Sequence, residues 1–366
     1  AEQGKLDFGK LDKDEHGNDK PASEHVDIVK VEGGVTHSGT TPFVWDMDKK
    51  GLSVGGKTEV TGDTFEIQNA GDVTLKGNTE VKGDGTNKGV LKIDNKENGG
   101  KVIFEGAEGG TAPVLNVGAN AEVDVNGKVE IINTNGNVAV SVGKGSTVAI
   151  GGGVIGDKAE EGKENVAIHV DGGQININAK GDETVVINGK IMLGKASKMM
   201  MMKSARSVVV PTDKSSVALT DENSSFNDDV QYLGTGDNKF AITITDGATW
   251  TGNSTGGIAL SIALDDGGAW TGYHEDDKGN TFDMELSNGA TWTNTATDET
   301  TINSLTGATG EGAKTGYINM SENTAADLTV EDYSGATTFV YANNYGKDVA
   351  DGELIKGGTV KIEKAA

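Results

Sequence analysis

Apolar and polar residues alternate over short stretches of this chain, and Gly, Asn and Asp interrupt these stretches at frequent intervals. Examples are Phe65-Glu66-Ile67, Val73-Thr74-Leu75 and Val123-Asp124-Val125. Alternation with a period of two is typical of a β-strand with one buried side, and Gly, Asn and Asp favour the turns between strands. A helical period is almost absent. The pattern therefore excludes a fold of alternating strands and helices and leaves a sandwich, a propeller or a β-solenoid.

Three segments in the C-terminal half align residue for residue. In each, three alternating apolar residues precede a polar-polar-Gly turn, a small residue and a tryptophan. The segments span residues 240–251, 260–271 and 282–293. Their tryptophans are Trp250, Trp270 and Trp292, which are 20 and 22 residues apart. A period near 20 with turns at fixed offsets is typical of a solenoid, whose stacked coils bury one continuous apolar column.

A looser repeat precedes this one. Val117-Gly118, Val142-Gly143 and Val170-Asp171-Gly172 are each followed, five or six residues later, by an alternating apolar stretch. The units are 25 and then 28 residues apart. Variable length around a constant strand pattern is what loops projecting from a solenoid produce. We therefore predict an all-β parallel β-helix that is continuous over residues 51–363.

Two segments break the periodicity. Residues 1–50 are charged and irregular, which predicts an N-terminal arm or cap. Residues 194–215 read as a loop excursion between two stretches of coils. This loop contains an apolar run flanked by Lys198 and Lys203, and the run consists of Met199, Met200, Met201 and Met202. The run is either an adaptable apolar contact for a partner or a loop folded against the coils, and the sequence leaves both interpretations open.

Composition fits a thin core and an acidic surface. Glycine accounts for 55 of 366 residues and hydrophobic residues for only 35%, so each strand contributes few inward side chains. The formal net charge of −24 predicts repulsion from nucleic acid and anionic membranes, and we expect no nucleic-acid partner. Arg206 is the only arginine, which argues against phosphate chemistry because phosphate clamps usually employ arginine.

The Gly-Ala-x-Trp-Thr repeat resembles the passenger domains of pertactin-like and self-associating autotransporter adhesins. The stretch 326–341, with Leu328, Val330, Tyr333 and Phe339, resembles the last β-helix turns of that family. The resemblance implies a right-handed helix and an autochaperone-like role for residues 301–363. It also implies type V secretion to the Gram-negative cell surface, with anchoring through a C-terminal β-barrel that this chain does not contain. The absence of cysteine agrees with export of an unfolded chain.

The function implied by the resemblance is that of a cell-surface adhesin. Such a β-helical rod would mediate bacterial adhesion, autoaggregation or biofilm formation. Its partners would be other copies of itself on neighbouring cells, or a host or bacterial surface protein or glycan. Two alternatives remain from the sequence: a polysaccharide-active β-helix lyase or hydrolase, and an inert structural stalk.

The aligned coils suggest two outward ladders of polar side chains as the adhesive surface. The first consists of Thr251, Thr271 and Thr293, and the second of Thr245, Asp265 and Ser287. Threonine also has a high preference for β-strands, so the competing interpretation is a row of threonines that contacts only solvent. Each tryptophan is an even number of residues away from the apolar residues of its segment, so it should point inward with them. This spacing predicts an internal stack of tryptophans and not a sugar-stacking platform.

No constellation of residues indicates catalysis. The stretch Gly252-Asn253-Ser254-Thr255-Gly256 matches the sequence pattern of a nucleophile elbow, which needs a strand, a tight turn and a helix. We expect this stretch in a polar loop with no helix after it, so the match does not indicate a nucleophile. The acid pairs Asp228-Asp229, Asp265-Asp266 and Asp276-Asp277 are expected in turns, where Asp side chains bond to the backbone. We therefore predict a chain that is not an enzyme and has no catalytic residues.

No metal or cofactor site is predicted either. Asp12, Asp14 and Gly17 match the start of a calcium loop, but His16 and Ser23 occupy positions at which such a loop needs other side chains. The histidines form no ligand pair, and we expect all of them at the surface. They are His16, His25, His37, His169 and His274.

Overall fold

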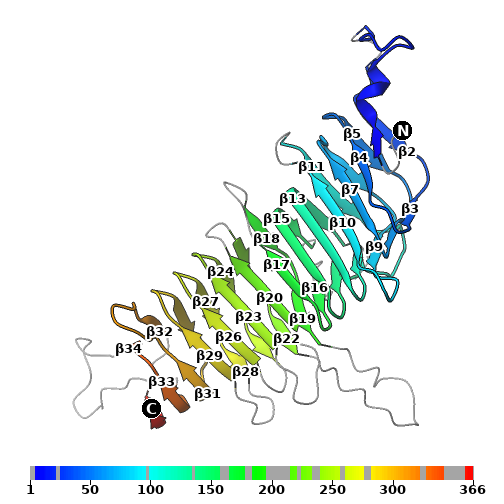
Figure 1. Cartoon of the computed structure of the whole chain (residues 1–366). Helices are drawn as coiled ribbons and strands as arrows, with labels where there is room; N and C mark the ends of the chain where they lie inside the picture. The colour runs from blue at the N-terminus through cyan, green and yellow to red at the C-terminus, as the bar shows by residue number, and fades with distance from the viewer. Residues whose placement is uncertain are drawn as a thin grey trace, which may run out of the picture. The chain divides into compact units, whose positions relative to one another are not determined.

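The computed structural model (Figure 1) describes residues 5–21, 25–95, 99–133, 137–156, 165–177, 184–194, 215–220, 224–232, 240–255, 260–275, 282–321, 327–341 and 359–365. These residues form strands and one 3-10 helix, η1 (Phe8–Asp12), and none of them lies in an α-helix. The chain divides into two compact units, Ala1–Gly189 and Lys190–Ala366. Each unit is a stack of short parallel strands, which confirms the predicted all-β parallel β-helix.

Three strand faces make up the N-terminal unit, and each face is one parallel ladder. The first face contains β1 (Lys5–Asp7), β4 (Phe43–Asp46), β7 (Thr64–Gln68), β10 (Gly89–Asp94) and β17 (Gln174–Ile177). The second contains β2 (Ile28–Val31), β5 (Gly51–Val54), β8 (Val73–Leu75), β11 (Lys101–Glu105) and β18 (Val185–Ile187). The third contains β3 (Val35–Ser38), β6 (Thr58–Thr61), β9 (Thr79–Lys82), β12 (Leu115–Val117), β14 (Val140–Val142) and β16 (Val166–Val170). The long strands β13 (Ala121–Ile132) and β15 (Thr147–Ile155) contribute to both the first and the second face.

Inward side chains of successive coils stack into apolar columns. On the first face, one column is at most 1% exposed and consists of Phe65, Leu91, Val123, Val148 and Ile175. On the third face, Val117, Val142 and Val170 lie opposite one another and are fully buried, which confirms the looser repeat. Because each coil adds only a few such residues, a chain poor in large apolar side chains can still fill this core.

Parallel pairing begins within the first 50 residues. β2 pairs with β5, and β4 pairs with β7. Helix η1 lies beside the first coil, with the ring centroid of Phe8 5.6 Å from that of Trp45 in an edge-to-face arrangement. The segment that the sequence suggested as an arm or cap thus contributes strands and an aromatic contact to the N-terminal unit.

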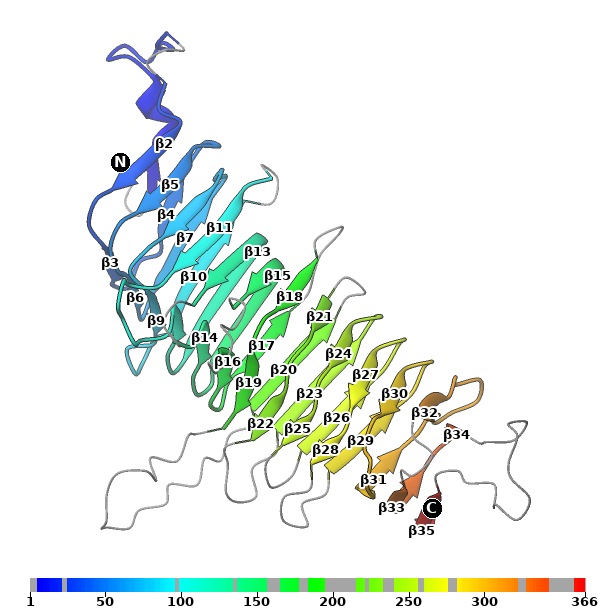
Figure 2. The same ribbon diagram turned by 180° about the vertical axis from the view of Figure 1, so that it is seen from behind.

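The C-terminal unit has the same three kinds of face. Its first face contains β20 (Ser215–Thr220), β23 (Phe240–Thr245), β26 (Leu260–Leu264), β29 (Phe282–Leu286), β31 (Thr300–Thr306), β33 (Leu328–Ser334) and β35 (Val360–Ala365). Its second face contains β21 (Ser224–Phe226), β24 (Thr249–Thr251), β27 (Ala269–Gly272), β30 (Thr291–Asn294), β32 (Gly316–Met320) and β34 (Thr337–Tyr341). Its third face contains β19 (Lys190–Leu193), β22 (Val230–Tyr232), β25 (Ser254–Thr255) and β28 (His274–Glu275). Figure 2 shows these strands from the opposite side.

Tight turns join the first face to the second at the same place in three consecutive coils. Asp266 and Gly267 both have positive φ, 42° and 77°, and Gly268 N–H donates to the carbonyl of Asp265 at 2.8 Å. Two central residues in the left-handed region define a type I′ turn, which favours Asp-Gly and Asn-Gly. The turns at Asp246-Gly247 and Asn288-Gly289 repeat this geometry, so the polar-polar-Gly motif fixes the corner.

Candidate functional site

The three tryptophans of the repeat form a stack inside the C-terminal unit. Trp250, Trp270 and Trp292 are at most 1% exposed. The ring centroids of Trp250 and Trp270 are 4.7 Å apart, and those of Trp270 and Trp292 are 5.1 Å apart, with planes tilted by only 7° and 10°. The predicted internal stack is confirmed, and these rings are not a surface platform for sugars.

Each indole also bonds to the coil before it. The Nε1–H of Trp270 donates to the carbonyl of Gly252 at 2.9 Å, and that of Trp292 donates to the carbonyl of Gly272 at 3.0 Å. A buried indole needs such an acceptor, because an unpaired N–H away from water is costly. A Cβ atom on Gly272 would lie 1.8 Å from the oxygen of Gly252. The glycine that follows Trp-Thr is therefore part of the stack, and its presence in two of the three repeats is the sequence signal for this role.

The first predicted ladder is present in the register of the second face. Thr251 lies opposite Thr271, and Thr271 lies opposite Thr293. Thr251 is exposed and the other two are half-buried, so all three side chains point away from the tryptophan core. The geometry of the ladder is as predicted, whereas its adhesive role stays a prediction.

The second predicted ladder lies in the type I′ turns. The hydroxyl of Ser287 donates to Oδ1 of Asp265 at 2.7 Å, and the side-chain amide of Asn288 donates to the same oxygen at 2.8 Å. The hydrogen bond from Ser287, with a smaller contribution from Asn288, holds the pKa of Asp265 below its usual value. Asp265 is therefore a fixed negative charge between two coils, and Thr245 occupies the equivalent turn position one coil earlier.

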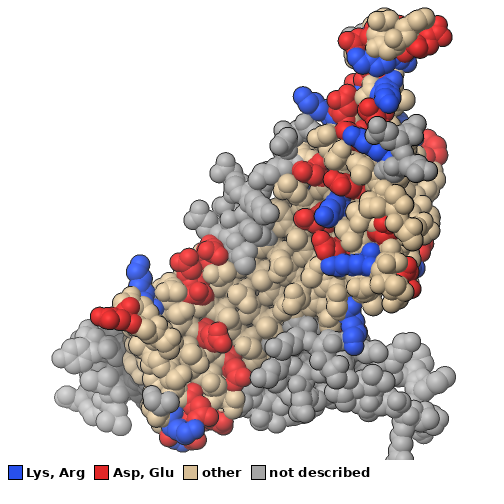
Figure 3. Space-filling model, in the orientation of Figure 1, with Lys and Arg blue, Asp and Glu red and all other residues tan. Residues whose placement is uncertain are grey.

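In the C-terminal unit, the outward side chains within β23 and β26 are uncharged, whereas the next strand, β29, carries Asp283 and Glu285. The outward residues of β23 and β26 include Ala241, Thr243, Ser261 and Ala263, and all are half-buried and uncharged. Figure 3 shows acidic side chains of this unit in separate groups with uncharged surface between them. Contact with another surface at these strands does not require the burial of a charge, which lowers the cost of association.

A cluster of four charges marks the third face of the N-terminal unit. Glu59 and Glu80 lie opposite each other on β6 and β9. The ammonium of Lys82 lies 2.8 Å from Glu59 and 3.1 Å from Glu80, and Lys57 pairs with both carboxylates. The lysines lower the pKa values of both glutamates, chiefly through Lys82 for Glu59 and through Lys57 for Glu80. The lysines thus offset the repulsion between stacked like charges, and the cluster is internally satisfied.

Ser254 and His274 differ from expectation. Ser254 lies on strand β25 and not in a polar loop, and its hydroxyl lies 2.9 Å from Nδ1 of His274 on the next coil. Ser254 is fully buried and His274 is 6% exposed, so the prediction that all histidines lie at the surface is wrong for His274. His274 is four residues after the inward Trp270, and this even spacing along the chain already indicated an inward side chain. Because Ser254 is inaccessible to solvent, this pair is a core hydrogen bond and not an exposed nucleophile.

The calcium-like segment has its carboxylates occupied by the chain itself. Asp14 accepts backbone N–H groups of His16 and Asn18, both at 2.8 Å. Asp12 pairs with Lys50 and accepts the Val26 N–H at 2.9 Å. Within the described ranges, no three His, Asp or Glu side chains are grouped so as to hold a metal ion.

The acid pairs expected in turns divide into two groups. Asp265 and Asp266 lie in a type I′ turn, and the carboxylate of Asp228 accepts the N–H of Asp229 at 2.8 Å. Asp276 and Asp277 lie outside the described residues, as do Met199, Met200, Met201 and Met202.

The described part of the chain contains no helix of the length and apolarity that a bilayer crossing requires.

Comparison with known proteins adds no relative. No family model, no curated protein and no solved structure matches this chain. A function for this chain therefore has to be inferred from the geometry of its two units and from the residues of its repeats.

Proposed function

We propose that this chain is a cell-surface adhesin passenger domain that promotes adhesion, autoaggregation or biofilm formation. The observation that carries the proposal is the register of Thr251, Thr271 and Thr293, which repeats one hydroxyl in each coil. Repeated weak contacts along stacked coils add up to avidity when two copies align. The resemblance of the Trp-Thr repeat to autotransporter adhesins gives the proposed location, the outer surface of a Gram-negative bacterium.

The proposed partner is a second copy on a neighbouring cell, with a surface protein or glycan as the other class of partner. The uncharged outward residues of β23 and β26 support contact between copies of a chain whose net charge is −24. Catalysis is not part of the proposal, because Ser254 is buried and the acid Asp265 is held by Ser287 and Asn288.

A settling assay tests the proposed function. Bacteria that display the chain should settle faster than bacteria that do not, and the purified chain should slow the settling by competing for the same contacts. Unchanged settling with the displayed chain would contradict a role in autoaggregation. Release of reducing or unsaturated sugar from common polysaccharides would instead support the alternative function, a polysaccharide hydrolase or lyase.

A further inference from the structure

A hollow of about 220 Å³ lies on the first face of the N-terminal unit, over β13, β15 and β17. Ala149 occupies the middle of it, opposite Asp124 in the coil before and Asn176 in the coil after. In the same outward column, Glu66 lies opposite Lys92, and Lys92 lies opposite Asp124. The hollow therefore exists because one coil carries a methyl group where the coils on either side carry the larger polar side chains of Asp124 and Asn176.

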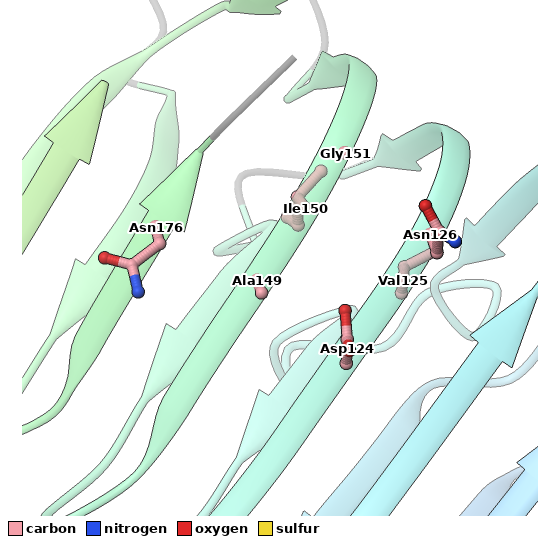
Figure 4. Close-up of a pocket in the computed structure, with 7 residues that line it drawn as sticks. All are labelled: Asp124, Val125, Asn126, Ala149, Ile150, Gly151 and Asn176. Carbon is pink, nitrogen blue, oxygen red and sulfur yellow. The ribbon is translucent and has the colours of Figure 1, made fainter. Parts of the chain in front are cut away.

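Polar groups face this hollow from two sides. Figure 4 shows Asp124 and Asn126 on one strand and Asn176 beyond the next, with Ala149 and Gly151 between them. The side-chain amide of Asn126 donates to Oδ1 of Asp94, in the coil before, at 3.3 Å. No residue in the described ranges offers a hydrogen bond or an ion pair to the side chain of Asp124 or Asn176. The carboxylate of Asp124 and the amide of Asn176 thus lie beside Ala149 without a partner among the described residues, and Asn126 keeps its side-chain oxygen and its second N–H for a ligand.

This arrangement suits a ring that carries several hydroxyl groups. A carboxylate accepts from two neighbouring hydroxyls, and an amide both donates and accepts. Bonds to an ionised carboxylate are the stronger kind. A calcium ion would need six or more oxygen ligands, which one carboxylate and two amides do not supply. An anionic ligand would be repelled by a chain with a net charge of −24.

The spacing of the coils fits one ring. Adjacent parallel strands are ~4.8 Å apart, so Asp124 and Asn176, two coils apart, are separated by roughly 10 Å at the backbone. One pyranose ring with its hydroxyls spans such a gap. We propose that the hollow at Ala149 is a subsite for one neutral hexose ring of a glycan. This inference rests on the proposed adhesin function, for which it names the class of ligand.

The substitution Ala149→Gln tests the site. Glutamine is uncharged and one methylene longer than Asn176 in the next coil, so it should fill the hollow from an outward position of the sheet. Ala263→Gln is the matched control, because Ala263 is also an outward alanine, between Thr243 and Glu285 on β26. Unchanged far-UV spectra and unfolding transitions of both variants would show that they are folded.

The readout is the NMR signals of the side-chain amides of Asn126 and Asn176. The probes are the methyl glycosides of glucose, galactose, mannose and N-acetylglucosamine at millimolar concentrations, with calcium chloride as a separate titration. At least one glycoside should shift both signals in a saturable way. Affinity should fall about tenfold or more in Ala149→Gln and stay unchanged in Ala263→Gln.

Three results would overturn the inference: no shift with any glycoside, equal binding by Ala149→Gln, or a shift of both signals by calcium alone. The titration contains no cells, so its outcome is separate from that of the settling assay. Settling without glycoside binding would contradict only the proposed sugar subsite. Glycoside binding without settling or adhesion would contradict only the proposed function.

Discussion

The indole ring of Trp270 lies parallel to that of Trp250, with centroids 4.7 Å apart and planes tilted by 7°. Trp292 continues the stack on the other side of Trp270. Each ring is buried, and each N–H bonds to the coil before it. The middle ring therefore links three coils through two stacking contacts and one hydrogen bond.

Trp270→Ala should destabilise the coils on both sides. The loss of a fully buried tryptophan costs about 3–5 kcal/mol through lost burial and the cavity left behind. Native-state hydrogen exchange of the amides in β24, β27 and β30 would measure this as a fall in their opening free energy. Trp270→Phe is the conservative control and should cost less. A change below about 1 kcal/mol in Trp270→Ala would contradict the stack as a source of stability.

Gly272→Ala should also destabilise this part of the C-terminal unit. A Cβ at Gly272 would lie 1.8 Å from the carbonyl oxygen of Gly252 and 2.8 Å from Nε1 of Trp270. Relief of such a clash needs backbone movement, with a cost of about 1–3 kcal/mol or more. Gly33→Ala is the control, because Gly33 has ordinary φ and a Cβ added there would meet no atom within 4 Å. Urea unfolding of both variants checks the difference, and equal midpoints would contradict the close approach.

The charge cluster at Glu59 and Glu80 should make the N-terminal unit sensitive to acid. Lys57 and Lys82 hold the pKa values of both glutamates below 4.5. Their contribution to stability is therefore present above that value and is lost as the pH falls through the lowered pKa. Glu80→Gln should cost below about 1 kcal/mol at pH 7, since the ion pairs are partly exposed. The deficit should shrink as the pH falls through the lowered pKa of the glutamate.

The matched control for this cluster is Glu66→Gln. Glu66 lies outward on β7, and no described residue forms an ion pair with it. Thermal unfolding of both variants at neutral and acidic pH gives the comparison. A deficit of Glu80→Gln that persists in acid would show that the carboxylate charge is not its cause.

The strand pattern made the fold predictable because parity and turn residues are local properties. Phe65-Glu66-Ile67 alternates visibly, and Asp266-Gly267 indicates its turn without knowledge of the partner coil. The register between the coils of the Trp-Thr repeat was also predictable, because equivalent residues of aligned repeats lie opposite one another in adjacent coils. These features required no knowledge of longer-range packing.

Features that depend on register between unlike coils were not predicted. The ion cluster needs Glu59 opposite Glu80, although Thr-Glu-Val recurs at residues 58–60 and 79–81 and could have suggested it. The hollow at Ala149 needs the pairing of three coils of different lengths. The buried contact between Ser254 and His274 joins residues of two aligned repeats, but only the strand assignment of Ser254 reveals it.

Light scattering of the purified chain over a range of salt concentrations tests the proposed self-association most directly. At low salt, copies with a net charge of −24 should repel and stay monomeric. As salt reaches physiological strength, the screening length falls to about 8 Å, and the scattered mass should rise. Thr271→Glu should raise the salt needed, while Thr74→Glu, an outward threonine on β8 of the N-terminal unit, should not. A chain that stays monomeric at every concentration and salt, or a Thr271→Glu variant that associates like the parent chain, would contradict the account.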